Sequence, residues 1–377
     1  ASTIDLKGKM VFPGLVETHL HLDTAYTAED NNFGFKCSYE EQAASLERRF
    51  QDLSEDAITE DIYSRGERLL NNCVKQGTTA VRAQLNFSGN WGENSLTAYE
   101  MLKKRFAGIL DMQNTVPYWP ENSDQWHKAA KKGRIDSVGG YPGLRKGGPE
   151  SWHKAIDELI GLAVEYGIPL DLHFNEPAEN PLSYARYLAD YILSKKDFTL
   201  YNKVTCSHFT ATEAPGISND VVIDIISRFA KANINVVALT SNDMVTVGTP
   251  DRRGTTSVQK FLDAGANVCL ASGNIRDTIH PFGNCDLLSE ALTAAQIHKL
   301  GTRRELRRLL ELITFNAAKA LNIENYGVLP GCTADLTVLD ADTPEDALIS
   351  QAKRLLVLKK GEKVAGELEL KGATNHD

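Results

Sequence analysis

The feature that most constrains the fold is a regular alternation of short apolar runs with longer stretches of helical periodicity. Stretches of helical period, such as 151–166 and 218–232, separate the apolar runs. Apolar strands that alternate with helices predict a parallel sheet with both faces covered. About eight such units over about 270 residues predict an α/β fold of the closed (β/α)8 TIM-barrel type rather than an open sheet. The eight expected strands are 14–21, 78–87, 108–116, 135–141, 169–174, 203–207, 235–239 and 267–272.

The pattern changes after residue 321. The segments 327–340 and 355–365 have the character of short strands separated by turns, which predicts a small β-sandwich appendage. A chain of 377 residues has room for one large domain and one small one. We therefore expect a barrel domain over 11–321 and a small β-sandwich domain over 1–10 and 322–377, formed mainly by the C-terminus.

Composition narrows the range of partners. The net charge of −9 argues against nucleic acid or an anionic membrane surface. No apolar run approaches the roughly 20 residues that span a bilayer. The six cysteines show no C-x-x-C spacing, so we expect buried free thiols in a reducing, cytoplasmic compartment. The sequence leaves open whether the chain forms a homo-oligomer.

A pair of histidines closes the first expected strand. In the decapeptide GLVETHLHLD at 14–23, His19 and His21 are two residues apart. Residues i and i+2 of a strand face the same side, so the two imidazoles project together. Zinc or iron accepts such ligands, although two structural histidines would produce the same pattern.

Polar side chains also close three later strands. His173 ends one strand and is followed by Glu176, His208 ends another, and the segment 267–277 carries Asn274 and Asp277. The carboxyl ends of all barrel strands converge at one mouth, so these groups can meet there. Three neutral imidazoles form a metal site with an open position, and a nearby glutamate can shuttle a proton.

Each of these residues has a structural alternative. His208 is placed where it could cap a helix, and Glu176 could face the dipole at a helix N-terminus. The coincidence of polar groups at four strand ends favours the functional interpretation.

The chain resembles the amidohydrolase superfamily, most closely its cytosine deaminase branch. The resemblance extends over nearly the whole chain. It is carried by PGLVETHLHLDT at 13–24, LHFNE at 172–176, SHFTA at 207–211, RRGTT at 252–256, AGANVCL at 264–270, NIRD at 274–277, PFG at 281–283, TFNAAKAL at 314–321 and GCTADL at 331–336.

The resemblance implies a residue-by-residue assignment. His19, His21 and His173 become ligands of one divalent metal, zinc or iron. Glu176 becomes the acid/base that protonates a ring nitrogen, and His208 orients the attacking water. A divalent metal supplies hydroxide near neutral pH, which agrees with this assignment.

The chain departs from the family at the last strand. The family places an aspartate there that touches the metal and takes a proton from water, whereas this chain has Gly273. Asn274 follows, but neighbours on a strand face opposite sides, so we do not expect Asn274 to replace the aspartate.

Two further departures concern the expected binding pocket. The branch often carries Arg-Thr-His-Val-Asp on the second strand, where this chain has RAQLN at 82–86. The segment PYWP at 117–120 lies near the position at which the deaminases carry a glutamine that reads the pyrimidine edge. Its Trp119 suggests a pocket that is more aromatic than theirs. The expected substrate-binding residues are Gln84, Trp119, Asn274 and Asp277.

Two classes of function follow. The first is a metal-dependent amidohydrolase or deaminase that hydrolyses a C–N bond of a small cyclic or amide-like substrate. The second is a reassigned site with weak or absent metal, which catalyses a cyclisation, isomerisation or elimination, or only binds a ligand. Loss of a general base costs about 10²- to 10⁴-fold in rate, so Gly273 keeps the second class open.

Overall fold

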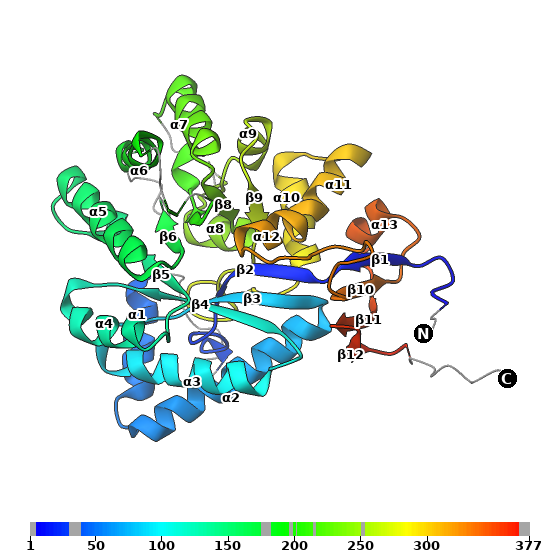
Figure 1. Ribbon diagram of the computed structural model, residues 1–377, viewed down its shortest axis with the longest axis horizontal. Helices are drawn as coiled ribbons and strands as arrows, with labels where there is room; N and C mark the ends of the chain where they lie inside the picture. Colours follow the sequence, from blue (N-terminus) through cyan, green and yellow to red (C-terminus); the bar gives the residue numbers. More distant parts are fainter. Residues whose placement is uncertain are drawn as a thin grey trace.

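The computed structural model describes residues 5–29, 39–174, 182–195, 199–200, 202–213, 216–249 and 253–368. Its centre is an eight-stranded parallel sheet in which each strand pairs with the next along the chain. Figure 1 shows these strands surrounded by helices. The barrel strands are β2 (Leu15–His21), β3 (Thr78–Gln84), β4 (Asp111–Pro117), β5 (Ser137–Gly140), β6 (Leu170–Phe174), β7 (Val204–His208), β8 (Asn235–Ala238) and β9 (Val268–Leu270).

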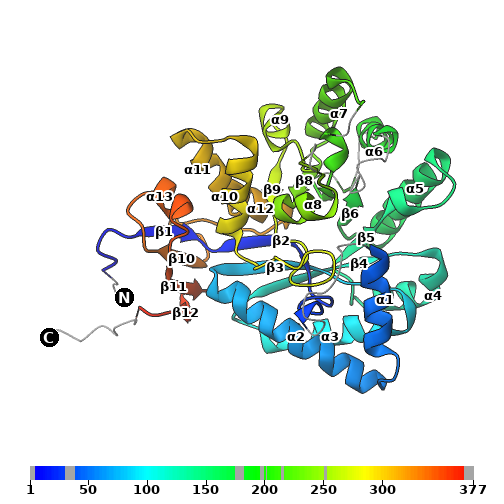
Figure 2. The same cartoon turned by 180° about the vertical axis from the view of Figure 1, so that it is seen from behind.

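Helices cover the outer face of the barrel, and both views show them on its periphery (Figures 1 and 2). Their apolar faces form one large core with the outward-facing strand residues. The helices are α1 (Tyr39–Phe50), α2 (Glu55–Lys75), α3 (Gly92–Arg105), α4 (Ser123–Lys131), α5 (Pro149–Tyr166), α6 (Ser183–Ser194), α7 (Asn219–Lys231), α8 (Thr240–Thr246), α9 (Val258–Asp263), α10 (Leu287–His298), α11 (Arg303–Leu312), α12 (Phe315–Ala320) and α13 (Pro344–Ile349).

Local sequence sets several helix boundaries. The Ser218 side chain accepts a hydrogen bond from the Val221 amide and begins α7, and Thr302 forms a capping box with Glu305 at the start of α11. Gly167 ends α5 in the left-handed conformation, with φ +68°.

The barrel closes through a single glycine. Leu20 of β2 forms an isolated parallel bridge with Gly273, which lies three residues beyond β9. The Gly273 amide donates to the His19 carbonyl, and the His21 amide donates to the Gly273 carbonyl, each at 3.0 Å. The closed (β/α)8 barrel predicted from the alternation of strands and helices is therefore confirmed.

A second, antiparallel sheet lies at one end of the barrel (Figure 1). Its strand order is β1 (Met10–Pro13), β10 (Leu336–Leu339), β11 (Arg354–Lys359) and β12 (Glu362–Gly366). The predicted β appendage is present, and within the described residues it is one four-stranded sheet. The strand β1 straddles the expected domain boundary at residue 10, because the chain passes from this sheet into the barrel at Gly14. A Cβ on Gly14 would lie 2.2 Å from Thr79 Oγ1, so only glycine fits at this crossing.

The cysteines and the apolar character of the helices bear on two of the sequence expectations. Cys73, Cys206, Cys269 and Cys285 are buried free thiols and Cys332 is partly buried, whereas Cys37 lies outside the described residues. Among the helices described, none combines the length and apolar character that crossing a membrane requires.

A buried carboxylate joins two helices outside the barrel. Glu290 of α10 accepts hydrogen bonds from the Ser241 hydroxyl at 2.6 Å and the Ser241 amide at 3.3 Å on α8. Burial is the main reason that the pKa of Glu290 rises to about 8, and the nearby carboxylates of Glu17 and Asp243 add to the rise. The protonated form of Glu290 is thus the form that the fold favours.

The Glu290→Gln variant should change how stability depends on pH. In the folded state the pKa of Glu290 lies above its ordinary value of 4.5. The contribution of protonated Glu290 to stability is therefore complete below pH 4.5 and is lost as pH rises towards about 8. The loss amounts to about 1.4 kcal/mol per pH unit at most. Urea unfolding between pH 5 and pH 8 should show the variant gaining stability relative to the wild type as pH rises. A difference that does not vary with pH would contradict this.

Candidate functional site

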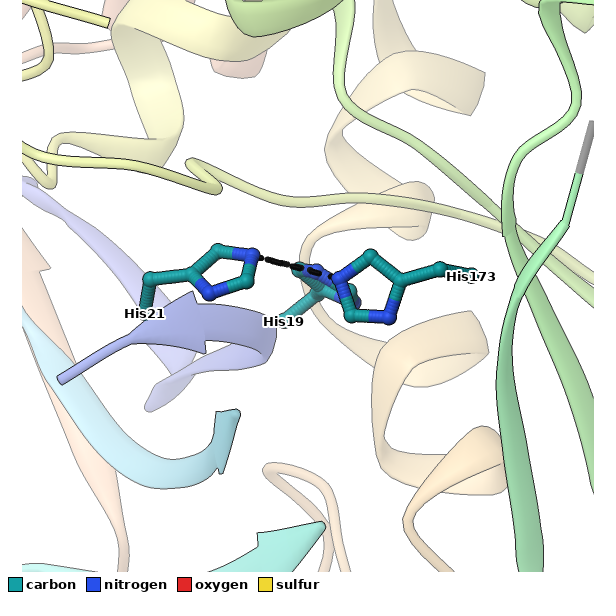
Figure 3. Close-up of side chains that lie close together, drawn as sticks. All are labelled: His19, His21 and His173. Carbon is teal, nitrogen blue, oxygen red and sulfur yellow. Dashed lines mark hydrogen bonds between the residues drawn. The ribbon is translucent and has the colours of Figure 1, made fainter. Parts of the chain in front are cut away.

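Three histidines meet inside the mouth of the barrel. His19 and His21 come from β2 and His173 from β6, and Figure 3 shows their rings directed toward one another. The Nε2 atom of His21 lies 3.3 Å from Nε2 of His19 and 3.2 Å from Nε2 of His173. One nitrogen from each ring falls within 4.8 Å of the others, so this group could hold a metal ion.

A bulge in β2 directs both histidines into the barrel. The register of β2 against β3 shifts between Glu17, which pairs with Val81, and Leu20, which pairs with Ala83. The extra residue places His19 on the inner face together with His21. The i, i+2 argument predicted that the two imidazoles share a face, and the bulge selects the inner one.

The environment keeps these imidazoles neutral. Burial, with a smaller contribution from the neighbouring His208, lowers the pKa of His21 to about 3. Burial, followed by the charges of the other rings, lowers the pKa of His19 and His173 well below the usual value. Neutral imidazole is the form that binds metal, so the three ligands need no deprotonation near neutral pH.

A chain of buried polar groups orients His19. Its Nδ1 lies 2.9 Å from the Ser207 hydroxyl, which donates to Asp171 at 3.5 Å. Asp171 forms a fully buried ion pair with Arg82 at 2.9 Å. Because Ser207 donates to the carboxylate, its oxygen accepts from His19 Nδ1, and Nε2 of His19 keeps its lone pair for a metal. Metal-binding histidines commonly have such a second partner.

His208 joins the same cluster from β7. Its ring centroid lies 5.4 Å from that of His19 and 5.2 Å from that of His173. Its Nδ1 lies 2.6 Å from Asp243 Oδ1 on α8. The structure therefore brings together all four histidines that the sequence singled out. Glu176 lies outside the described residues.

A cavity of about 170 Å³ opens beside the histidines. Trp119 stacks on Tyr141, with ring centroids 5.6 Å apart and planes at 12°, and Tyr141 lies 4.2 Å from the His173 ring. The Tyr141 hydroxyl is 3.5 Å from His173 Nε2. An aromatic wall thus runs from the cavity to the three clustered histidines. The described lining residues are His21, Gln42, Asn86, Ser88, Pro117, Trp119, Tyr141, Leu144, His173, Asn274 and Ile279.

The expected substrate-binding residues separate into two groups. Trp119 and Asn274 line the cavity. Gln84 is buried beside His21 in the β2–β3 register, outside the described lining. Asp277 is also outside it and is buried, accepting hydrogen bonds from Thr24, Gln42 and Asn274 side chains and from two backbone amides. Its contacts are those of a residue that holds the loop after β9.

Asn274 lines the cavity, and its expected role in substrate binding stays a prediction. Gly273 has φ +70°, outside the extended region, so the alternation of a regular strand does not continue through it. The Asn274 side chain lines the cavity and donates to Asp277 at 2.6 Å. The backbone amide of Asn274 donates to Asn242 Oδ1 at 3.1 Å.

Sequence reasoning missed several groups of this site. Asp171 precedes His173 by two residues on the same strand, so the i, i+2 rule that was applied to His19 and His21 could have placed it inside the barrel. Tyr141 closes an expected strand, which is the position that defined the other candidates. Asp243 follows β8 by five residues and carries no local signal of its contact with His208.

Comparison with known proteins identifies the family. A model described as the amidohydrolase family matches residues 67–365. The chain belongs to the amidohydrolase family. N-isopropylammelide isopropyl amidohydrolase of Pseudomonas sp. (strain ADP) is 29% identical over 372 residues, covering 95% of this chain and 86% of that protein. Pterin deaminase of Rhizobium rhizogenes is 24% identical over 371 residues, covering 95% of this chain and 81% of that protein.

Solved structures agree with this assignment. 5-methylcytosine deaminase from Klebsiella pneumoniae, liganded with 5-fluorocytosine, superposes with a TM-score of 0.86 at 25% identity, covering 98% of this chain and 91% of that one. N-isopropylammelide isopropylaminohydrolase from Burkholderia multivorans superposes with a TM-score of 0.79 at 25% identity, covering 95% and 87%. The predicted superfamily, fold and class of hydrolase, acting on C–N bonds other than peptide bonds, are confirmed.

Gly273 occupies a position that resists any side chain. An ideal Cβ there would lie 2.7 Å from Leu239 Cδ2 and 2.9 Å from Asn242 Oδ1. Its positive φ adds backbone strain for other residues. A carboxylate introduced by Gly273→Asp would meet the same two obstacles before it reached the three histidines.

Gly273→Ala should lower the free energy of unfolding by about 1–3 kcal/mol, because the methyl group strains the backbone and displaces its neighbours. Chemical denaturation measures this. Gly161→Ala is the matched control, since Gly161 lies in α5 with nothing within 4 Å of its Cβ position. That variant should be as stable as the wild type or more so. Equal stabilities for the two variants would contradict the tight packing at Gly273.

Proposed function

We propose that this chain is a metal-dependent hydrolase that cleaves a C–N bond of a small, neutral, planar nitrogen heterocycle. His19, His21 and His173 would hold one divalent cation, zinc or iron. The observation that carries the proposal is the convergence of their nitrogens within 4.8 Å of one another at the base of a cavity. Three neutral imidazoles are a known ligand set for a catalytic metal with an open position.

The cavity supports a neutral planar substrate. Its described lining contains no lysine, arginine, aspartate or glutamate. Trp119 and Tyr141 provide parallel aromatic faces against which a ring can stack. The amides of Gln42, Asn86 and Asn274 can donate to and accept from the edges of a heterocycle. The names of two relatives, which refer to isopropylammelide and pterin, point to the same class of ring.

In the proposed reaction, each residue of the site would have a separate role. When bound, a divalent cation would polarise the substrate and supply hydroxide near neutral pH. His208 would hold the attacking water beside the ring, and Glu176 would carry a proton to the leaving nitrogen or to a ring nitrogen. Trp119 and Tyr141 would keep the ring in place and exclude water from one of its faces.

The alternative of a non-hydrolytic enzyme or a ligand-binding protein rests on Gly273, which provides no carboxylate. The named relatives given above are hydrolases and a deaminase, and none points to a cyclisation, isomerisation or elimination. The four clustered histidines also exceed what ligand binding requires. We therefore favour hydrolysis.

Metal analysis tests the ligand assignment. Protein purified without chelator should contain about one zinc or iron per chain, and His173→Ala should lose it because two imidazoles bind a divalent ion too weakly. Ser207→Ala should keep the metal but with about 10- to 100-fold lower affinity, because His19 loses the group that orients it. Elemental analysis and competition with a chelator give both results. Unchanged metal content in His173→Ala would refute the assignment.

Product release tests the reaction. A panel of aminopyrimidines, aminotriazines, N-alkylaminotriazines and pterins should include at least one ring from which the metal-loaded protein releases ammonia or an amine. Trp119→Ala should raise KM for that ring by about 2- to 10-fold, because stacking contributes about 0.5–1.5 kcal/mol beyond the buried area. Conversion of a panel member with neither release of ammonia or amine nor addition of water to the product would instead support the alternative.

A further inference from the structure

We propose that Asp243 is a positioning residue, which holds the His208 imidazole with its proton on Nδ1 and so commits Nε2 to the reaction site. This inference rests on the proposed function for its catalytic consequence. The juxtaposition of Asp243 and His208 is independent of that function.

The contact between the two side chains is short and buried. His208 Nδ1 lies 2.6 Å from Asp243 Oδ1, and the exposed fractions of the two side chains are 1% and 0%. A carboxylate only accepts hydrogen bonds, so the Nδ1 atom of His208 donates. When the ring is neutral, its one proton then lies on Nδ1, and Nε2 can accept a hydrogen bond from a water molecule.

The backbone holds His208 from the other side. His208 and Phe209 have φ values of +74° and +51°, which is strained for non-glycine residues. The Thr256 hydroxyl donates to the His208 carbonyl, and the Phe209 amide donates to the Phe174 carbonyl at 2.8 Å. These contacts hold the strained backbone in place, and they thereby fix the direction in which the His208 side chain leaves the backbone.

The ring is fixed beside the metal-binding group. Its centroid lies 5.4 Å from that of His19 and 5.2 Å from that of His173. With Nδ1 engaged by Asp243, Nε2 is the nitrogen that remains for the reaction site. Gly273 supplies no acceptor there, so His208 becomes the group that must present one.

Asp243 is not needed to attach α8 to the barrel. The same helix is held by Ser241, which donates to Glu290, and by Asn242, which accepts from the Asn274 amide. A carboxylate of zero exposure is costly unless it is paired, and Asp243 contacts the side chain of His208 as well as that of its neighbour Asn242. The pair is therefore best understood through its effect on the imidazole.

The test compares the zinc-loaded wild type with Asp243→Asn. An asparagine can donate to Nδ1, which would move the His208 proton to Nε2, as in other enzymes whose orienting aspartate is replaced. Nitrogen-15 NMR of the imidazoles, assigned with a His208→Gln sample, should show the Nδ1–H tautomer in the wild type and the Nε2–H tautomer in the variant. The zinc content should remain about one per chain in both.

Kinetics supply the second measurement. For the ring identified in the substrate panel, kcat should fall about 10²- to 10⁴-fold in Asp243→Asn while KM changes by only a few-fold. Glu290→Gln is the matched control, because it alters a buried carboxylate attached to the same helix without touching His208. It should keep the wild-type tautomer and kcat.

The outcomes distinguish this inference from the proposed function. An Nε2–H tautomer in the wild type, which can be read even when the variant does not fold, would overturn the role of Asp243. Wild-type kcat in Asp243→Asn would overturn it as well. A tautomer that shifts as expected in a protein that hydrolyses none of the panel would support the positioning of His208 while refuting the proposed function.

Discussion

The hydrogen bonds between Gly273 and the backbone of His19 and His21 are the constraint on which the rest of the structure depends. They join the last strand to the first and so turn an eight-stranded sheet into a barrel. The same two bonds hold the peptide units on either side of Leu20, between the two histidines. The same backbone hydrogen bonds therefore close the barrel and position the two histidines, so a change that disturbs one would also disturb the other.

This arrangement explains why a glycine occupies position 273. The backbone of position 273 completes the barrel, and its φ of +70° lets the chain turn toward Asn274. Leu239 and Asn242 occupy the space that a side chain would need. The surroundings have thus adapted to the absence of a side chain, and the missing carboxylate is a property of the whole β8–β9 corner rather than of one residue.

The fold was largely predictable from the sequence because its signals are local. Each apolar run between Leu15 and Leu270 became a barrel strand, and the strand ends that carry histidines do converge. Reasoning from a regular pattern stops where a single backbone angle breaks that pattern. The alternation of a strand does not continue through Gly273, because its φ is positive, so alternation alone could not place Asn274 in the cavity lining.

The contacts between distant residues could not be predicted in the same way. Asp171 could have been found through its spacing from His173, but the pairing of Asp243 with His208 depends on how β7 and α8 pack. Tyr141 shows a similar limit, since its position at a strand end was visible and its stacking on His173 was not. The sequence locates groups along a strand, and only packing determines which groups meet across the barrel.

The charge distribution of the site follows from these contacts. The three candidate ligands are neutral, so a divalent cation among them would keep its full formal charge. The nearest carboxylates do not contact the position between the three histidines. Asp171 contacts His19 through Ser207, and Asp243 contacts His208 directly. Carboxylates at that distance polarise imidazoles without neutralising a cation. Under the proposed function, a site built in this way would have no carboxylate at the metal and would keep a stronger electrophile, and the imidazole of His208 would hold the attacking water.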